Sequence, residues 1–369
     1  MTTVAAADPR ADAAFMAAAL SLSARNLGDV WPNPSVGCVL VKDGVVVGRG
    51  WTASGGRPHA ETIALDRAGP KANGATAYVT LEPCSHHGRT PPCADALIEA
   101  GISRVVVATT DPDSRVSGRG IAKLKAAGVI VEVGLSKGEA DRLNAGHFLR
   151  AKHNRPFFAL KVAASLDGRI ALANGDSKWI TAPPAGRAVQ ALRARFDAIL
   201  IGSGTALADD PLLTCRLDGY SGRAKVRIVL DRRLRLSMNS RLVTTAKDIP
   251  TWVVTADVGP KAESLAAQGV EVITAGADMP VQTVGELLAS RGLTRVLVEG
   301  GSAVAGSFLK GEMVDEIAWF TAPVLIGGDG LAAVGELSAS HIGAIPTFRR
   351  CENLVFAFDT LDMLVRKGP

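Results

Sequence analysis

Apolar and polar positions alternate in two ways along this chain, and both halves show the same order. Short apolar runs bounded by glycine or aspartate predict strands, and segments with an apolar residue at every third or fourth position predict helices. In the first half, Asp43-Gly44 predicts a hairpin between strands at 35–41 and 45–50. The other elements expected there are strands at 77–81, 104–109 and 129–133 and helices at 58–68, 92–100, 120–127 and 141–150.

The alternation resumes after the polar segment 152–156, which ends in proline. Two domains are therefore predicted, residues 1–150 and 151–369. In the second, strands are expected at 157–163, 198–201, 226–230, 251–255, 270–273, 295–299, 316–323 and 353–360, and helices at 184–195, 262–268, 283–291 and 303–310. The repeated strand–helix order predicts the α/β class, with sheets covered by helices.

Composition excludes several classes of protein. The chain has 369 residues, of which 47% are hydrophobic and 21% charged, as in an ordinary globular protein. Its five cysteines are few and odd in number, so no disulfide scaffold is expected and a reducing, cytoplasmic location is predicted. No apolar stretch approaches 18 residues, and the alanine-rich start lacks the basic residues of a signal peptide. The net charge of +5 suits phosphorylated ligands, nucleic acid or simply a basic surface.

One group of residues carries a specific chemistry. His59-Ala60-Glu61 is followed by Cys84 and Cys93, which is the residue set of a zinc-dependent base deaminase. His59, Cys84 and Cys93 are the predicted zinc ligands, and the fourth position is left for water. Glu61 is the predicted catalytic proton carrier. A spacing of two residues brings His59 and Glu61 together only at the irregular start of a helix, as Pro58 indicates.

Eight residues separate the two cysteines, where deaminases usually have two. The string 82–93, and the upstream segment 33–40, resemble the pyrimidine deaminase half of the bifunctional riboflavin-biosynthesis deaminase/reductase family. The resemblance covers the chain from about Asp12 onward. It implies a cytidine-deaminase-like α/β/α sandwich followed by a dihydrofolate-reductase-like α/β domain. It also implies zinc and NADPH as cofactors and a phosphoribosyl-diaminopyrimidine as the substrate.

Further deaminase residues come from this resemblance. Asn33 is expected to hold the pyrimidine edge, and His86 and Arg89 to face the ring or the phosphate; the alternative for the latter two is a solvated loop. Asp113 ends a motif that in the family often ends in asparagine, so its role stays open. The segment 117–120 leads into a helix and is either a phosphate site or a plain turn.

Three strings in the second half, at 160–169, 208–216 and 298–302, resemble the reductase half of the same family. The Rossmann fingerprint is absent, because the segment 202–205 lacks the third glycine. The resemblance implies reduction of the ribosyl group to a ribityl chain, with NADPH carrying the hydride. It places NADP beside Ala163, Trp179, Thr205, Asp209, Gly301 and Ser302, and the substrate beside Ser177, Arg193, Leu213, Arg216 and Glu299.

Basic residues complete the predicted reductase site. Arg193 and Arg216 suit a phosphate because a planar guanidinium matches it at two points. Lys161 is expected to point from a strand end toward the cleft and to orient the sugar. Arg232 is the candidate for the 2′-phosphate of NADP, although Arg233 and Arg235 lie close enough to exchange roles with it. Trp179 is a core residue in the alternative interpretation.

Two other functions compete with this one. A nucleic-acid deaminase with an added NADP module fits the basic charge, but the chain lacks a basic stripe interleaved with aromatic residues. A binding protein with a structural zinc would need a fourth protein ligand, for which Cys38 is the candidate. Cys38 follows Gly37 within the hairpin and is expected to pack in the core instead. The preferred interpretation has no nucleic-acid or membrane partner and assembles as a homodimer or higher homo-oligomer.

Overall fold

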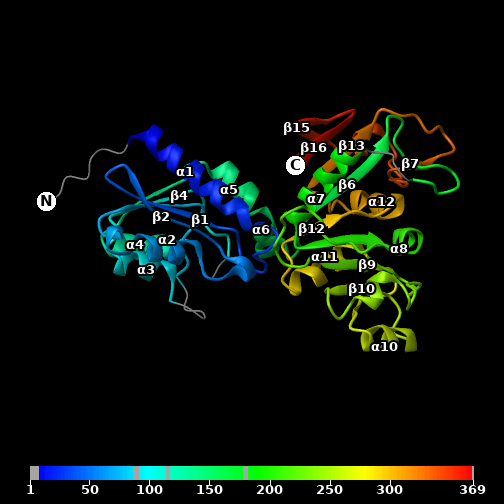
Figure 1. Ribbon diagram of the computed structural model, residues 1–369, viewed down its shortest axis with the longest axis horizontal. Helices are drawn as coiled ribbons and strands as arrows, with labels where there is room; N and C mark the ends of the chain where they lie inside the picture. The colour runs from blue at the N-terminus through cyan, green and yellow to red at the C-terminus, as the bar shows by residue number, and fades with distance from the viewer. Residues whose placement is uncertain (1–7, 86–90, 114–116, 178–181, 368–369) are drawn as a thin grey trace. The chain divides into compact units, whose positions relative to one another are not determined.

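The computed structural model describes residues 8–85, 91–113, 117–177 and 182–367, and the chain folds as two units. The first unit is Met1–His153 and the second is Asn154–Pro369. Each unit is built around its own β-sheet (Figure 1). No helix among the described residues has the length and apolarity needed to cross a membrane.

The first sheet has five strands in the order β2-β1-β3-β4-β5. β1 is antiparallel to β2 and β3, whereas β3, β4 and β5 are parallel. Asp43 and Gly44 have φ angles of 50° and 76°, so the turn that they form confirms the predicted hairpin. The strands are β1 (Gly37–Lys42), β2 (Val45–Trp51), β3 (Thr76–Val79), β4 (Arg104–Val107) and β5 (Ile130–Val133).

Helices cover both faces of this sheet (Figure 1). Successive residues of β1 point to opposite faces. Cys38 and Leu40 pack with α2, α3 and α4, whereas Val39 and Val41 pack with α1 and α5. The predicted α/β/α sandwich is therefore confirmed, and Cys38 is a core residue. The helices are α1 (Pro9–Ser23), α2 (Ala60–Ala68), α3 (Cys93–Glu99), α4 (Arg119–Ala126), α5 (Lys137–Leu143) and α6 (Ala145–His153), with 3-10 turns at Ala24–Asn26, Ser54–Gly56 and Gly69–Ala72.

The second sheet has nine strands in the order β11-β10-β9-β8-β12-β6-β13-β16-β15. The seven strands from β11 to β13 are parallel, and the hairpin β15–β16 is added antiparallel to β13. Parallel strands place their carboxyl ends at one edge, where ligands of α/β proteins bind. The strands are β6 (Phe157–Ser165), β8 (Ala198–Gly202), β9 (Val226–Leu230), β10 (Thr251–Thr255), β11 (Glu271–Thr274), β12 (Arg295–Val298), β13 (Glu316–Ala322), β15 (Phe348–Phe356) and β16 (Asp359–Arg366).

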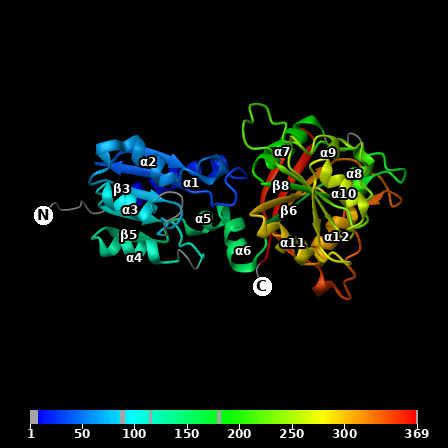
Figure 2. The same ribbon diagram turned by 90° about the horizontal axis from the view of Figure 1, so that it is seen from below.

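Helices surround this sheet (Figure 2). α8, α9 and α10 contribute to the core formed with β8, β9 and β10, and α7 packs on β13 and β16. Phe308 of α12 packs against Phe158 of β6, with ring centroids 5.0 Å apart. The helices are α7 (Pro183–Ala194), α8 (Ser203–Asp209), α9 (Arg241–Thr244), α10 (Pro260–Ala267), α11 (Val281–Ser290) and α12 (Ser302–Lys310); a small separate sheet joins β7 (Arg169–Ala171) to β14 (Leu331–Ala332), and Ile342–Ala344 is a 3-10 turn.

Two local expectations were wrong, and the helix α8 was not predicted. The strand expected at 353–360 is broken by a turn at 357–358, where Ala357 adopts a φ of 59° without the glycine or proline that marks most turns. The helix expected at 141–150 is divided at Asn144, whose side-chain oxygen accepts a hydrogen bond from the Ser35 amide. α8 follows β8 directly, and its Ser-Gly-Thr start lacks a strong helix signal.

Candidate functional site

The ends of three elements bring the predicted zinc ligands together. His59 is the N-cap of α2, Cys84 follows β3 and Cys93 is the first residue of α3. His59 Nδ1 lies 3.3 Å from Cys93 Sγ and 3.7 Å from Cys84 Sγ. Among the described residues these three form the one group of potential metal ligands, with all ligand atoms within 4.8 Å of one another.

This geometry fits a zinc ion. Ligands of a tetrahedral zinc, at about 2.3 Å for sulfur and about 2.0 Å for nitrogen, lie about 3.5–3.8 Å from one another. The two measured nitrogen–sulfur separations, 3.3 and 3.7 Å, lie on either side of the value of about 3.5 Å expected for such a pair. Cys38 is fully buried in the core and is not a member of the group, so the described residues supply three ligands. Three protein ligands are the pattern of a catalytic site rather than a structural one.

The two cysteines differ in acidity. A hydrogen bond from the Cys93 thiol lowers the pKa of Cys84 to about 4, and the Cys93 amide also donates to Cys84 Sγ at 3.3 Å. The hydrogen bond to Cys84 and burial raise the pKa of Cys93 well above its ordinary value. The pocket therefore already favours one thiolate, the form in which cysteine binds zinc.

Glu61 lies in the first turn of α2, one residue after the start of the helix. Its side chain is buried, with only 3% of the residue exposed, and it lies within hydrogen-bonding reach of Cys93. Burial raises the pKa of its carboxyl above the ordinary value, although the nearby His59 opposes this effect. A buried carboxyl with a raised pKa, beside a metal site, is suited to accept and return a proton.

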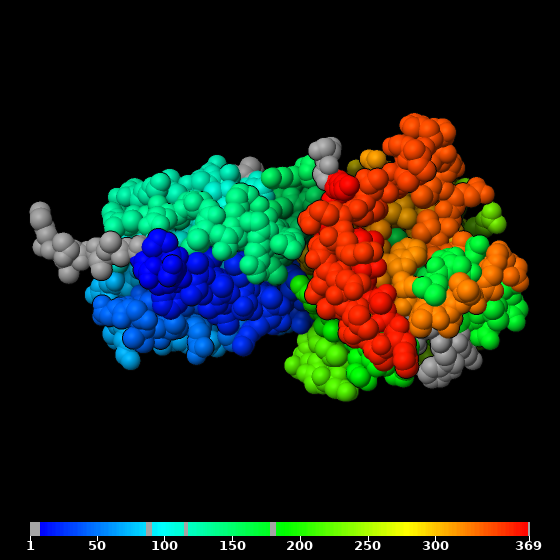
Figure 3. All heavy atoms as spheres, turned by 90° about the horizontal axis from the view of Figure 1, so that it is seen from above, coloured from blue at the N-terminus to red at the C-terminus, as the bar shows by residue number. Residues whose placement is uncertain are grey.

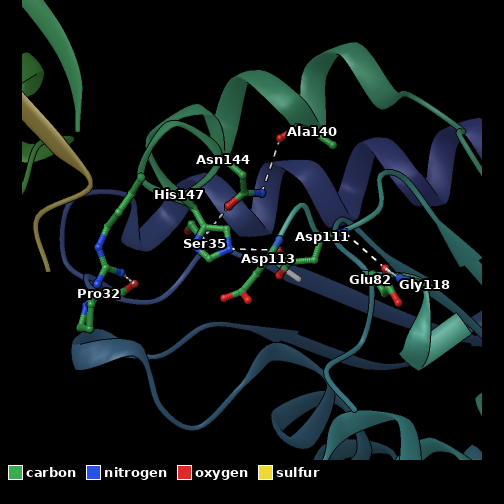
Figure 4. A network of polar contacts seen from close by, with 10 residues as sticks. Pro32, Ser35, Glu82, Asp111, Asp113, Gly118, Ala140, Asn144 and His147 are labelled. Atoms are coloured by element: carbon green, nitrogen blue, oxygen red, sulfur yellow. Dashed lines mark hydrogen bonds and ion pairs between the residues drawn. The ribbon is translucent and has the colours of Figure 1, made fainter. Parts of the chain in front are cut away.

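The loop that carries Asn33 is held from both sides by the end of the first unit (Figure 4). Asn144 accepts a hydrogen bond from the Ser35 amide at 3.0 Å, and Arg150 donates to the Pro32 carbonyl at 3.3 Å. The Asn33 side chain packs closely on Gly56. A Cβ added to Gly56 would lie 2.0 Å from Asn33 Nδ2. These contacts give Asn33 a defined position.

The side chain of Glu82, which is buried, binds the backbone of segment 117–120, the segment considered above as a phosphate site. Glu82 accepts hydrogen bonds from the amides of Gly118 and Gly120, both at 3.0 Å, at the start of α4. It also accepts from the Asp111 amide at 3.3 Å (Figure 4). Because the amides of Gly118 and Gly120 already donate to a carboxyl group of the same unit, this contact favours the plain turn over the phosphate site for segment 117–120.

Asp113 lies in the same loop as Asp111. Asp111 Oδ1 accepts a hydrogen bond from the Asp113 amide at 2.9 Å and lies 3.2 Å from His147 Nε2 (Figure 4). The backbone at Asp113 is thereby fixed from α6. His86 and Arg89, which were expected to face the substrate, lie outside the described residues, as does Trp179 in the second unit.

The second unit contains a cavity of about 670 Å³ at the carboxyl edge of its sheet. Eight of the residues expected from the resemblance line it: Lys161, Ala163, Ser177, Thr205, Asp209, Glu299, Gly301 and Ser302. Pattern reasoning missed the lining residues 170–171 and 331–333, which belong to the small β7–β14 sheet or directly follow it. These strands have three and two residues, too short for a periodic signal.

Glycines shape the floor of this cavity. A Cβ on Gly202 or on Gly300 would lie 2.7 Å from the side chain of Val304, and one on Gly301 would lie 3.4 Å from Thr205. The absence of these side chains lets the start of α12 approach β8 closely. A wide cavity beside glycine backbone and a helix start fits a phosphate-bearing cofactor.

Arg193 forms an ion pair with Glu299 and is not among the residues that line the cavity. Its Nε and Nη2 donate to the two carboxylate oxygens at 2.7 and 2.8 Å, and Nη1 donates to the Thr214 carbonyl at 2.9 Å. Burial raises the pKa of Glu299, but the hydrogen bonds from Arg193, followed by the charges of Lys161 and Arg216, bring it below its ordinary value. Glu299 is thus an anion at the cavity wall.

Three other expected residues lie apart from the lining. Leu213 packs in the core with residues of β8 and β9 and has a φ of 48°. The Arg216 amide donates to the Gln190 side chain at 2.8 Å. The Arg232 guanidinium is exposed and lies 3.9 Å from Asp278.

Two family models match the chain. The cytidine and deoxycytidylate deaminase zinc-binding region matches residues 9–109, and the RibD C-terminal domain matches residues 156–351. The first range contains the zinc ligands and Glu61, and the second contains every residue that lines the cavity. The two models match separate halves of the chain.

Full-length relatives are similar over nearly the whole chain. Riboflavin biosynthesis protein RibD of Escherichia coli (strain K12) is 44% identical over 92% of this chain and 95% of its own length. The protein of that name from Aquifex aeolicus is 42% identical, over 90% and 92%. Acinetobacter baumannii RibD (form 1) has a TM-score of 0.90 and 36% identity, covering 98% of this chain and 100% of its own. A diaminohydroxyphosphoribosylaminopyrimidine deaminase/5-amino-6-(5-phosphoribosylamino)uracil reductase from Thermotoga maritima has a TM-score of 0.85 and 36% identity, covering 97% and 99%.

Proposed function

Because this chain belongs to the RibD family of bifunctional riboflavin-biosynthesis enzymes, we propose that its two units carry out successive steps on one substrate. The first is hydrolytic deamination of 2,5-diamino-6-(5-phosphoribosylamino)pyrimidin-4(3H)-one. The second is NADPH-dependent reduction of the ribosyl group, which yields 5-amino-6-(5-phosphoribitylamino)uracil. The observation that carries this proposal is the three-ligand zinc site with buried Glu61 beside it.

The first unit, Met1–His153, is assigned the deamination. His59, Cys84 and Cys93 would hold the zinc, which when bound would supply an activated water for attack on the amino-bearing ring carbon. Glu61 takes a proton from that water and returns it to the amine, which leaves as ammonia when the ring C–N bond breaks. Asn33 holds the pyrimidine edge, and His86 and Arg89 are assigned to the rest of the substrate.

The second unit, Asn154–Pro369, is assigned the reduction. NADPH supplies the hydride when bound. We assign Ala163, Thr205 and Asp209 to the cofactor, together with Trp179, Gly301, Ser302 and a basic residue for its 2′-phosphate. Lys161 and Glu299 face the same cavity and are assigned to the substrate sugar. Ser177, Leu213 and Arg216 are assigned to the remainder of the substrate, and Arg193 acts on it through Glu299.

We also propose a homodimer or higher homo-oligomer in the cytoplasm. β15 is an edge strand whose residues are mostly exposed, and it forms a hairpin with β16 on the surface shown in Figure 3. Val355 and Phe358 are 66% and 81% exposed there. An exposed edge with apolar side chains supports pairing with a second copy. All five cysteines are free thiols, which supports a reducing compartment.

The Glu61→Gln variant tests the proposal. It keeps the zinc ligands but removes the proton carrier, so ammonia release from the diaminopyrimidine should fall by at least about 100-fold. Zinc content, measured by elemental analysis, should stay at the wild-type level. The same variant supplied with the deaminated intermediate should oxidise NADPH at the wild-type rate. Ammonia release at the wild-type rate would refute the role of Glu61, and absence of NADPH oxidation in the wild type would refute the reductase assignment.

A further inference from the structure

The turn that follows β9, residues 231–236, carries three arginines at the edge of the sheet where the cavity lies. Resting on the proposed reductase function, we infer that Arg235 binds the 2′-phosphate of NADPH and makes the enzyme select NADPH over NADH. The neighbouring Arg232 does not take this role. Two features carry the inference: the rigidity of the turn and the different directions in which its arginines reach.

The turn is held by hydrogen bonds and by buried side chains. The Leu234 amide donates to the Asp231 carbonyl at 3.1 Å, and the Leu236 amide donates to Asp231 Oδ2 at 2.7 Å. Leu234 and Leu236 are 2% and 0% exposed, and both belong to the core that includes β8 and β9. Leu234 has a φ of 49°, a strained angle that the surrounding packing must enforce. Arg235, between two anchored leucines, is exposed.

Arg235 reaches toward β8. Its Nη2 donates to Ser203 Oγ at 2.7 Å. Ser203 is the first residue of α8 and stands between Gly202 and Gly204, both of which line the cavity. This bond uses one of the five N–H donors of the guanidinium, and among the described residues no carboxylate pairs with the others. A planar guanidinium held beside the cavity is suited to bind phosphate at two points.

Arg232 points the other way. Its guanidinium lies 3.9 Å from Asp278, in the loop after β11, and its carbonyl accepts a hydrogen bond from the Ala256 amide that follows β10. In the sheet, β10 and β11 lie on the side of β9 opposite to β8. The Arg232 side chain is 58% exposed and that of Asp278 is 91% exposed, so the pair is a weak surface contact away from the cavity.

The acidic residues nearby do not oppose a phosphate. In dinucleotide-binding folds, an acidic residue near this position binds the ribose 2′-hydroxyl and favours NAD. Here Asp231 directly follows β9 but is fully buried, and its Oδ2 accepts a hydrogen bond from the Leu236 amide. Asp209 lines the cavity at the opposite end of α8, about 9 Å from Ser203 along the helix. The structure thus holds the Arg235 guanidinium beside two glycines that line the cavity and keeps the Asp231 carboxyl in the core.

Equilibrium binding of two cofactor fragments tests this inference without turnover. Full-length, zinc-loaded protein is titrated calorimetrically with 2′,5′-ADP, which carries the 2′-phosphate, and with 5′-AMP, which lacks it. Arg235→Ala should weaken 2′,5′-ADP binding by about 10–100-fold, the contribution of a charge-assisted contact, and should change 5′-AMP binding by less than about threefold. The unchanged 5′-AMP affinity shows that the cavity is intact. The preference in kcat/KM for NADPH over NADH should fall by the same factor.

Arg232→Ala is the matched control, because it removes an exposed arginine from the same turn. It should leave both affinities and the NADPH preference at the wild-type values. Retained preference in Arg235→Ala, or its loss in Arg232→Ala, overturns the assignment while the reductase function stands. A wild-type protein that binds 2′,5′-ADP no more tightly than 5′-AMP, and that does not oxidise NADPH with the deaminated intermediate, overturns the proposed function itself.

Discussion

Replacement of Arg193 by methionine would leave Glu299 as an unpaired carboxylate in the second unit. The side chains of the pair are 11% and 7% exposed, so both charges have lost most of their water. Removal of one partner from a buried ion pair costs about 3–5 kcal/mol of unfolding free energy. This cost includes the lost hydrogen bond to the Thr214 carbonyl, which contributes about 1 kcal/mol.

The pH dependence separates this mechanism from simple loss of packing. In the wild type the Glu299 pKa lies below 4.5, so its carboxylate contributes stability above that pH, and this contribution is lost as the pH falls through the lowered pKa. In Arg193→Met, burial without the ion pair raises the pKa of Glu299, and the charged form then destabilises the fold. Protonation relieves that cost. The difference in unfolding free energy between the variant and the wild type should therefore be largest at pH 8 and should decrease toward pH 5.

Hydrogen exchange measured by mass spectrometry in increasing urea would report on α7 and β12 directly, and so on the second unit alone. Arg291→Met is the control, because Arg291 and Glu271 form a pair in the same unit with side chains 31% and 45% exposed. It should cost less than about 1 kcal/mol and show little pH dependence from pH 5 to 8. A loss below about 1 kcal/mol in Arg193→Met, or a loss that does not change with pH, would refute the reasoning.

Other predictions concern the first unit. Hydrogen bonds from Arg104 lower the pKa of Asp12, so its carboxylate stabilises the fold above pH 3.8, and this contribution is lost as the pH falls through the lowered pKa. Asp12→Asn should therefore reduce the loss of unfolding free energy between pH 6 and pH 2, measured by unfolding titrations. A methyl group on Gly50 would lie 2.0 Å from a carbonyl oxygen of α2, so Gly50→Ala should cost about 1–3 kcal/mol and weaken zinc binding measured with a competing chelator, whereas Gly138→Ala, with open space around it, should be neutral. Cys93→Ser should lose zinc and ammonia release but keep NADPH oxidation with the deaminated intermediate, and loss of both activities would contradict the separation of the two sites.

Local sequence signals correctly predicted the elements that have a clear periodic pattern or that are bounded by turn or helix-start residues. The Asp43-Gly44 hairpin, the helix entered at His59 and the helix opened by Cys93 are all found where the sequence predicted them. Turns without glycine or proline were missed, as at Ala357, and so were strands of two or three residues. Such elements owe their stability to packing with distant parts of the chain, which leaves no periodic trace in the sequence.

The residue types of the zinc site followed from the sequence alone, because metal chemistry restricts ligands to a few side chains in a recognisable order. The surroundings of individual charges did not. Arg193 and Arg232 have the same side chain, and pattern reasoning expected each to bind a phosphate. Only the tertiary structure shows that Arg193 forms a buried ion pair with Glu299 and that Arg232 lies at the surface beside Asp278. The role of an arginine depends on which groups the fold places around it, and those groups come from strands far apart in the sequence.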